Sequence, residues 1–268
     1  MNYGAFAKRL IPESLLQRVL PRGFQAMSIG TPKSGTTSVA RLFHPGFRSD
    51  HEPERRPFVT AMQQHFRGVI DDDTWIRFLR RRDRELWLEM ESNCFLGYRP
   101  DLVMRAFPTA QFVLTVREPR SWLRSMIDNH IDYPPRAGTG MRLWHDVFFR
   151  PDLQSFSPGE AVLREHDLYP ARTYLAYWVA HNQAVLEAVP AERLMVLGTR
   201  EITPKAGELA DFLGIDLSRL NLERSHANTT PVRHGVFDNL DPDWIDAQVE
   251  EVCGDLITRS ELATHIEA

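Results

Sequence analysis

Short apolar runs alternate along this chain with longer segments in which apolar side chains recur at helical spacing. The short runs predict strands at residues 24–30, 86–90, 111–116 and 193–197. The helical spacing predicts helices at residues 38–43, 74–82, 121–129, 171–189 and 205–213. Strands separated by helices of this length are typical of a parallel sheet with helices on both faces. The expected fold class is therefore α/β, with a central parallel sheet flanked by helices.

Residues 132–170 interrupt this alternation and show little sustained periodicity. The segment contains Gly138, Gly140 and Gly159 and five prolines, which are Pro134, Pro135, Pro151, Pro158 and Pro170. Long segments of this kind are often lids or binding loops. We therefore expect residues 1–268 to form a single domain with one long, partly irregular insertion at about 132–170.

Composition and charge exclude several classes of protein. Among 268 residues, 36 acidic and 32 basic side chains give a net charge of −4, which argues against a protein that mainly coats nucleic acid. The two cysteines, Cys94 and Cys253, form no CxxC pair, so neither a disulfide framework nor a thiolate zinc site is expected. Both cysteines are expected to be reduced and buried, as in a cytoplasmic protein.

No apolar run approaches the roughly 18 residues needed to cross a bilayer. The N-terminal segment also lacks the apolar stretch and the cleavage site of a secretory signal. We therefore expect no transmembrane segment and a cytoplasmic location. Apolar side chains within residues 6–19 predict a helix that packs on the domain or lies on a membrane surface, so peripheral membrane contact stays open.

The strongest chemical signal directly follows the first predicted strand, which is where parallel sheets bind their ligands. Residues 30–38 read Gly-Thr-Pro-Lys-Ser-Gly-Thr-Thr-Ser and stand between a strand and a helix. Glycines let backbone amides approach an anion closely, and the helix N-terminus adds partial positive charge. The segment therefore predicts a phosphate-binding loop. Its expected binding residues are Lys33, Ser34, Gly35, Thr36, Thr37 and Ser38.

The loop differs from that of a nucleotide kinase or ATPase, in which GxxxxGK[ST] places a lysine directly after the second glycine. Here Gly30 and Gly35 have the correct separation, but Thr36 follows the second glycine and the lysine stands at position 33. This departure counts against a P-loop nucleotide or small-molecule kinase, which stays the alternative enzyme class. A non-catalytic nucleotide-binding module is the third interpretation.

Residues 32–37, Pro-Lys-Ser-Gly-Thr-Thr, resemble the 5′-phosphosulfate-binding loop of sulfotransferases that use 3′-phosphoadenosine 5′-phosphosulfate (PAPS). That family holds the 3′-phosphate with an arginine just after a central strand and a serine eight positions later. Arg117 and Ser125 meet this spacing, and a guanidinium and a hydroxyl placed in this way can converge on one phosphate. The resemblance implies a P-loop NTPase-like sulfotransferase fold, PAPS as the sulfuryl donor and adenosine 3′,5′-bisphosphate (PAP) as the product.

The resemblance covers about residues 24–128 and 172–240. Two positions depart from the cytosolic sulfotransferases: Ser38 stands where they have an adenine-stacking Trp, and Thr199 stands roughly where they have Tyr. The adenine contacts are therefore left open. In that family a loop near the C-terminus closes over the 3′-phosphate. The segment that resembles this loop contains Arg233, His234 and Gly235.

Sulfuryl transfer moves a neutral SO₃ unit, so positioning and charge stabilisation should dominate, by analogy with phosphoryl transfer. Lys33 is expected to stabilise the negative charge that develops on the leaving 5′-phosphate. The transferred group carries less charge than a γ-phosphoryl group, so no metal is expected to be required. The resemblance further implies that Ser125 restrains the lysine until the acceptor binds.

A general base is expected to take the proton of the acceptor hydroxyl. His51 and Glu52, at the end of a further strand after the phosphate-loop helix, are the candidates, and the sequence does not choose between them. A simple polar turn is the alternative interpretation of this segment. His130 is the reserve base, and Ser92 and Asn93 could line the acceptor site.

The expected acceptor is a hydroxyl group of a small molecule, a glycolipid or a saccharide. Aromatic side chains of the insertion could pack on an apolar metabolite or stack on sugar rings; they are Tyr133, Trp144, Phe148, Phe149 and Phe156. The arginines within residues 77–84 predict a solvated helix face, and the acidic residues 71–73 predict a helix cap. The identity of the acceptor and the oligomeric state are not specified by these patterns.

Overall fold

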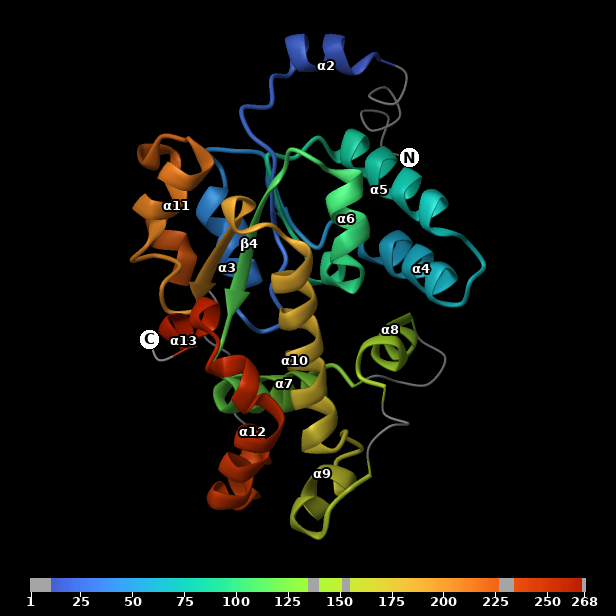
Figure 1. Cartoon of the computed structure of the whole chain (residues 1–268), viewed down its shortest axis with the longest axis vertical. Helices are drawn as coiled ribbons and strands as arrows, with labels where there is room; N and C mark the ends of the chain where they lie inside the picture. The colour runs from blue at the N-terminus through green and yellow to red at the C-terminus, as the bar shows by residue number, and fades with distance from the viewer. Residues whose placement is uncertain (1–10, 135–139, 151–154, 227–233, 267–268) are drawn as a thin grey trace.

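A five-stranded sheet, all of whose strands are parallel, forms the centre of the computed structural model, which describes residues 11–134, 140–150, 155–226 and 234–266. The strand order is β2-β3-β1-β4-β5. The strands are β1 (Ala26–Ser28), β2 (Ser49–His51), β3 (Met90–Ser92), β4 (Gln111–Val116) and β5 (Leu194–Gly198). Helices cover both faces of this sheet (Figure 1), so the expected α/β class is confirmed.

Successive residues of each strand face opposite layers of helices, as the two-residue period of a strand requires. In β4, Phe112 and Leu114 belong to the larger apolar core, whereas Val113 belongs to the smaller one. The larger core includes side chains of α6 (Pro100–Ala106) and α10 (Ala171–Ala188), and the smaller core those of α3 (Thr36–Phe43) and α11 (Ala206–Leu213). Figure 1 shows these two pairs of helices on opposite sides of β4.

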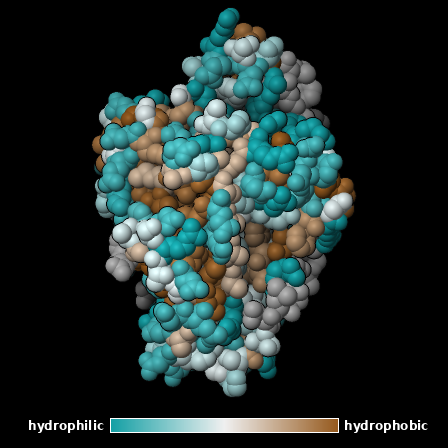
Figure 2. All heavy atoms as spheres, in the orientation of Figure 1, coloured by the Kyte–Doolittle hydropathy of each residue, from teal (hydrophilic) through white to brown (hydrophobic). Residues whose placement is uncertain are grey.

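The remaining helices extend this three-layer core. They are α2 (Glu13–Val19), α4 (Arg55–Phe66), α5 (Asp72–Leu86), α7 (Pro119–Asp132), α8 (Gly140–Phe148), α9 (Ala161–Glu165), α12 (Pro242–Ile257) and α13 (Ser260–Ile266). Short 3₁₀ helices are η1 (Cys94–Tyr98), η3 (Pro158–Glu160), η4 (Ala191–Arg193), η5 (Leu217–Arg219), η6 (Leu222–His226) and η7 (Phe237–Asn239). On the face drawn in Figure 2, hydrophilic side chains cover the upper end, over α2 and α5, and hydrophobic ones show mainly in the middle.

Three of the four predicted strands match the structure, and one is wrong; β5 begins and ends one residue later than the predicted residues 193–197. Strand β4 occupies the predicted residues 111–116, and β1 lies inside the predicted residues 24–30. The strand predicted at residues 86–90 does not form, because α5 continues to Leu86 and β3 begins only at Met90. Strand β3 escaped prediction because its middle residue, Glu91, is charged, although the strand is buried throughout.

Glu91 is tolerated inside the sheet because Arg82 neutralises it. Arg82 Nη1 donates to both carboxylate oxygens of Glu91, at 2.8 and 2.7 Å, and Arg82 Nη2 donates to the carbonyl oxygen of Pro53 at 2.6 Å. Both charged side chains are less than a tenth exposed. Arg82 therefore departs from the solvated face predicted for the arginine run, whereas Arg77 and Arg81 are exposed.

The described part of the insertion has more regular secondary structure than its sequence predicts. It contains α8, η3 and α9, and α8 packs on α4. Trp144 and Phe149 are buried in the larger core, Phe148 and Phe156 are partly buried against it, and Tyr133 is exposed. Most of the insertion's aromatic side chains thus stabilise the fold, because they pack on one another and on the tyrosines of α10.

Three smaller predictions can be compared with the structure. Asp71 caps α5 by accepting a hydrogen bond from the Thr74 amide at 2.8 Å, as predicted for the acidic run. Cys94 and Cys253 are buried and form no disulfide. None of the helices in the described ranges combines the length and the apolar composition needed to span a bilayer.

Removing Arg82 should destabilise the fold strongly, because it leaves the buried Glu91 carboxylate without its counter-charge. We expect Arg82→Ala to lower the free energy of unfolding by about 3–5 kcal/mol in urea denaturation. Arg77→Ala, on the exposed face of the same helix, should change it by about 0.5 kcal/mol or less. Equal losses in the two variants would contradict this account of the ion pair.

Candidate functional site

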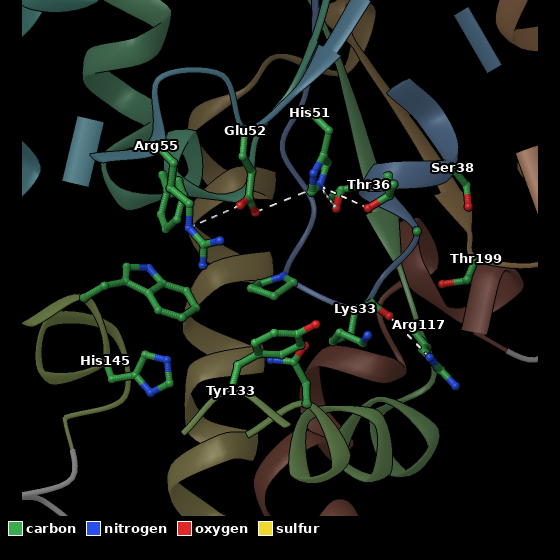
Figure 3. A pocket seen from close by; sticks show the side chains of 16 residues that line it. Lys33, Thr36, Ser38, His51, Glu52, Arg55, Arg117, Tyr133, His145 and Thr199 are labelled. Carbon is green, nitrogen blue, oxygen red and sulfur yellow. Dashed lines mark hydrogen bonds and ion pairs between the residues drawn. The ribbon is translucent and has the colours of Figure 1, made fainter. Parts of the chain in front are cut away.

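A cavity of about 310 Å³ lies at the carboxyl ends of the strands, where a parallel sheet binds its ligand. Each strand contributes to it at or after its carboxyl end. The contributions are Lys33 after β1, His51 at the end of β2, Phe95 after β3, Arg117 after β4 and Thr199 after β5. Figure 3 shows Lys33, Arg117, Ser38 and Thr199 on one side of this cavity and Arg55 and His145 on the other.

The predicted phosphate loop connects β1 to α3, and two of its positions require glycine. A side chain at Gly30 would overlap Thr115 and Ser34, so only glycine lets the loop approach β4 this closely. Gly35 has a φ of +100° and stands at the N-cap of α3, where no side chain caps the helix. The N-terminus of α3 therefore presents its partial positive charge to the cavity, which is lined there by Thr36, Thr37 and Ser38.

Two cationic side chains, Lys33 and Arg117, lie together beside this helix terminus. Arg117 Nη1 donates to the carbonyl oxygen of Lys33 at 3.4 Å, and Arg117 Nε donates to Ser121 Oγ at 2.6 Å. Burial and then the charge of Arg117 lower the pKa of Lys33, and the carboxylates of Asp132 and Asp128 act in the opposite direction. An anion bound here would relieve the repulsion between the two cations, so the arrangement favours a phosphate or sulfate group.

The hydroxyl of Ser34 supports the loop from inside. Ser34 Oγ donates to the carbonyl oxygen of Thr31 at 2.6 Å and lies 2.9 Å from Thr115 Oγ1, and the side chain is fully buried. It does not line the cavity, although the sequence placed it among the phosphate ligands. Thr199 holds the loop from the other side, since its Oγ1 lies 3.0 Å from the carbonyl oxygens of Ser34 and Val116.

His51 lies against the phosphate loop. Its Nε2 is 3.1 Å from Thr36 Oγ1 and 3.3 Å from Thr37 Oγ1, two hydroxyls on the first turn of α3. Burial is the main cause that lowers the pKa of His51, against a smaller opposing effect of Glu52. The imidazole is therefore neutral at pH 7, and it can form hydrogen bonds with the loop hydroxyls without adding a charge to the loop.

Glu52 lines the cavity, and Figure 3 shows its side chain between those of His51 and Arg55. Its Oε1 is 3.9 Å from His51 Nε2 and its Oε2 is 3.6 Å from Arg55 Nε. Cys94 Sγ donates to Oε1 at 3.2 Å. The backbone of Glu52 has a φ of +49°, and its amide donates to the carbonyl oxygen of Ser92 at 2.9 Å. The carboxylate is thus held at a defined place and faces the cavity.

The other half of the cavity is mainly aromatic. Its lining residues there are Arg55, Phe95, Tyr133, Trp144 and His145. Sequence reasoning missed Arg55, Phe95, His145 and Asn129, because nothing in their local sequence distinguishes them from core or surface residues. Arg55 and His145 meet at the cavity because α8 packs on α4, which joins segments about 90 residues apart, whereas η1 brings Phe95 and α7 brings Asn129.

Several predicted site residues lie outside the cavity. Ser125 is buried on α7, and its Oγ has no hydrogen-bond partner among the described residues. His130, the reserve base, is wrong for that role, because it is buried and its Nδ1 is 2.8 Å from Tyr174 Oη. Ser92 and Asn93 do not line an acceptor site either. Both are fully buried, and the Ser92 hydroxyl donates to the carbonyl oxygen of Thr36 at 2.7 Å.

The segment predicted to cover the 3′-phosphate reaches α7. His234 Nε2 lies 2.7 Å from Asp132 Oδ1, and the His234 amide donates to Asp128 Oδ1 at 3.1 Å. Gly235 has a φ of +74°, and neither it nor His234 lines the cavity. Arg233, which belonged to the same prediction, lies outside the described residues.

Metal ligation was not expected at this site. The described ranges contain no group of three or more His, Cys, Asp or Glu side chains placed to hold a metal ion. The cations and hydroxyls around the loop are the groups available to an anionic ligand.

The chain matches one known protein family. The model of a family described as "Sulfotransferase domain" matches residues 25–229. A sulfotransferase from Alicyclobacillus acidocaldarius is similar in structure, with 17% identity over 88% of this chain and 96% of that chain and a TM-score of 0.48. Sulfotransferase STF9 from Mycobacterium avium has 12% identity over 94% of this chain and 83% of that chain, with a TM-score of 0.50. No curated protein matches the chain.

Three buried histidines near the site should make the fold sensitive to mild acid. Burial is the main cause that lowers the pKa of His130 to about 3, of His145 to about 2 and of His181 to about 4, from 6.5. The unfolded chain takes up protons at these imidazoles near pH 6.5 and the native state does not, so acid favours unfolding. We expect the free energy of unfolding to be level between pH 8 and 7 and to fall by about 2 kcal/mol per histidine from pH 7 to 5.

Urea denaturation at pH 8, 7, 6 and 5 measures this dependence. His130→Gln should reduce the acid-induced loss by about 2 kcal/mol, because the contribution of this one buried imidazole is gone. Glu201, whose pKa is lowered to about 2, changes the pH dependence of stability only below about pH 4.5. Between pH 7 and 5 the change in stability therefore comes from the histidines. Unchanged stability between pH 7 and 5 would contradict the burial of neutral histidines.

Proposed function

The chain belongs to the sulfotransferase family, and from this premise we propose that it transfers a sulfuryl group from PAPS to a hydroxyl group of a small-molecule, glycolipid or saccharide acceptor. The observation that carries the proposal is the convergence of Lys33 and Arg117 beside the uncapped N-terminus of α3. Backbone amides, two cations and three hydroxyl side chains would then face the phosphate and sulfate groups of one anionic ligand.

The residues on the donor side fit PAPS in chemistry. The 5′-phosphosulfate would lie against residues 33–38, and Arg117 would bind the 3′-phosphate. The buried Ser125 hydroxyl has no partner among the described residues, and a phosphate oxygen that reached it beyond the cavity lining would accept its hydrogen bond. Ser121 lies one helical turn before Ser125 and already orients the Arg117 guanidinium.

PAPS supplies an activated sulfuryl group, so the protein needs to position it and to stabilise charge on the leaving phosphate. Lys33 is the residue placed for that charge, and its lowered pKa reflects a partly buried ammonium that gains from an anionic partner. The amides at the start of α3 add fixed dipoles in the same direction. His51, bonded to the hydroxyls of Thr36 and Thr37, orients this turn.

Glu52 is the better placed of the two candidate bases. His51 directs its Nε2 to the donor loop, whereas the Glu52 carboxylate lies between the loop and the aromatic half of the cavity. An acceptor ring held by Phe95, Trp144 and Tyr133 would present its hydroxyl to this carboxylate. Glu52 would take the hydroxyl proton as the oxygen bonds to sulfur, which is general-base catalysis.

Donor binding can be tested by thermal unfolding with PAP, AMP and Mg-ATP. Ligand at 100 times its dissociation constant stabilises a protein by about 2.7 kcal/mol, a clear rise in melting temperature. We expect this rise with PAP, and we expect Arg117→Ala to abolish it. Arg120→Ala, three residues later on α7 and paired with Asp246 at the surface, should keep it. A rise with Mg-ATP alone would reject PAPS as donor and restore the kinase interpretation.

The base can be identified by comparing two variants in PAPS-dependent turnover. Glu52→Gln keeps the size of the side chain and should lower kcat by about 10²–10⁴-fold, while the PAP-induced thermal shift persists. His51→Asn should mainly weaken PAP binding, because it disturbs the loop hydroxyls. Loss of turnover in His51→Asn with normal PAP binding, together with an active Glu52→Gln enzyme, would reverse the two roles.

A further inference from the structure

We infer that Cys94 is a positioning residue for Glu52: its thiol holds the carboxylate in place, and the buried ion pair of Arg82 and Glu91 anchors both partners. The inference rests on the proposed function, in which Glu52 is the base. It concerns a residue that lies behind the cavity wall and contacts neither donor nor acceptor, since Cys94 does not line the cavity.

The contact itself is short and specific. Cys94 Sγ donates to Glu52 Oε1 at 3.2 Å, and the cysteine side chain is buried while the glutamate reaches the cavity. Burial raises the pKa of the Cys94 thiol well above its usual value, and the nearby Glu52 charge acts in the same direction. The sulfur is therefore protonated throughout the physiological range and acts there as a hydrogen-bond donor.

Both ends of this contact are fixed by the same buried network. On the glutamate side, Arg82 Nη2 donates to the carbonyl oxygen of Pro53, the residue after Glu52. On the cysteine side, Asn93 Nδ2 donates to Glu91 Oε1 at 2.7 Å, and Arg82 holds both oxygens of that carboxylate. The two segments that carry Glu52 and Cys94 are thus joined through one ion pair.

The backbone adds a second connection between the same segments. The Glu52 amide donates to the carbonyl oxygen of Ser92, at the end of β3, and Asn93 caps η1, which begins at Cys94. The left-handed backbone of Glu52 is held by these contacts. The separation between the sulfur and the carboxylate is therefore set by the fold rather than by two free side chains.

A thiol is well suited to hold a carboxylate that has to accept a proton. Its S–H donates a weak hydrogen bond, so it restrains the carboxylate while reducing its basicity less than a hydroxyl or an ammonium would. Arg55 Nε, at 3.6 Å from Oε2, is beyond hydrogen-bond distance and adds a longer-range attraction. Glu52 keeps lone pairs for the acceptor proton.

A purely structural role for Cys94 makes different predictions, and Cys253 provides the matched control. Cys253 is also buried in the larger core, and it lies on α12, away from the cavity. Replacing either cysteine with alanine removes the same atoms from the core, so their losses of stability are comparable. Only Cys94→Ala also removes a donor from the proposed base.

The test compares Cys94→Ala, Cys94→Ser, Cys253→Ala and wild type in two measurements. The first is the pH dependence of kcat/KM with PAPS. The second is a ¹³C NMR titration of the Glu52 side-chain carboxyl carbon, assigned with Glu52→Gln, which requires no turnover. A hydrogen bond donated to a carboxylate favours its ionised form, so removing the donor should move both the acid limb and the titration midpoint to higher pH.

We expect Cys94→Ala to show this upward displacement and to lower kcat roughly three- to tenfold. Cys94→Ser restores a stronger donor and should displace both curves in the opposite direction, below wild type. Cys253→Ala should reproduce the wild-type curves even where its melting temperature falls. Cys94 variants whose curves coincide with wild type and with Cys253→Ala would overturn the inference.

Failure of the proposed function gives a separate pattern. If wild type neither binds PAP nor turns over PAPS, the function is rejected, while the NMR titration still reports whether Cys94 controls the Glu52 carboxylate. If wild type is active and Glu52→Gln is equally active, Glu52 is not the base and Cys94 has no positioning role in the reaction. If wild type is active, Glu52→Gln is inactive and the Cys94 curves do not move, only the inference fails.

Discussion

The buried ion pair between Arg82 on α5 and Glu91 on β3 connects the interior of the sheet to the edge where the chemistry is proposed. A charged pair inside a core contributes little net stability, because both groups lose their hydration. Its effect here is geometric. Arg82 reaches the turn after β2 and Glu91 reaches the turn after β3 through Asn93, so two neighbouring strand ends keep one relative position. Because these strand ends line the cavity, this part of the cavity has a fixed shape.

All five strands run in the same direction, so their carboxyl ends meet at the cavity. The residues that line it form two halves of different chemistry. The loop after β1 and the residue after β4 bring cations and amides, and the opposite half is closed by aromatic side chains on α8 and η1. Glu52 stands at the boundary between them. In the proposed reaction, this division would separate the groups that hold the negative charge of the donor from the carboxylate that takes the proton of the acceptor.

Local patterns predicted those parts of the molecule whose structure depends on adjacent residues. Strand β4 was predicted at its actual residues because six consecutive positions avoid charge, and the phosphate loop was predicted from its glycines and Lys33. Strand β3 was missed because the partner of Glu91 stands nine residues earlier in another element. His145 and Arg55 were missed for the same reason, since their approach depends on α8 packing on α4. The direction of the Ser34 hydroxyl, inward to Thr115, is likewise set by a strand 81 residues away.

The order of strands across the sheet also has a consequence for synthesis of the chain. Strand β1 is made early, yet it lies in the middle of the sheet, paired with β3 at residues 90–92 and with β4 at residues 111–113. The loop after it is further held by Thr199, after the last strand. The contact that Thr199 makes with this loop therefore forms only after about three quarters of the chain has been synthesised. In the proposed function, the loop would gain its full set of supporting contacts for donor binding only when β5 joins the edge of the sheet.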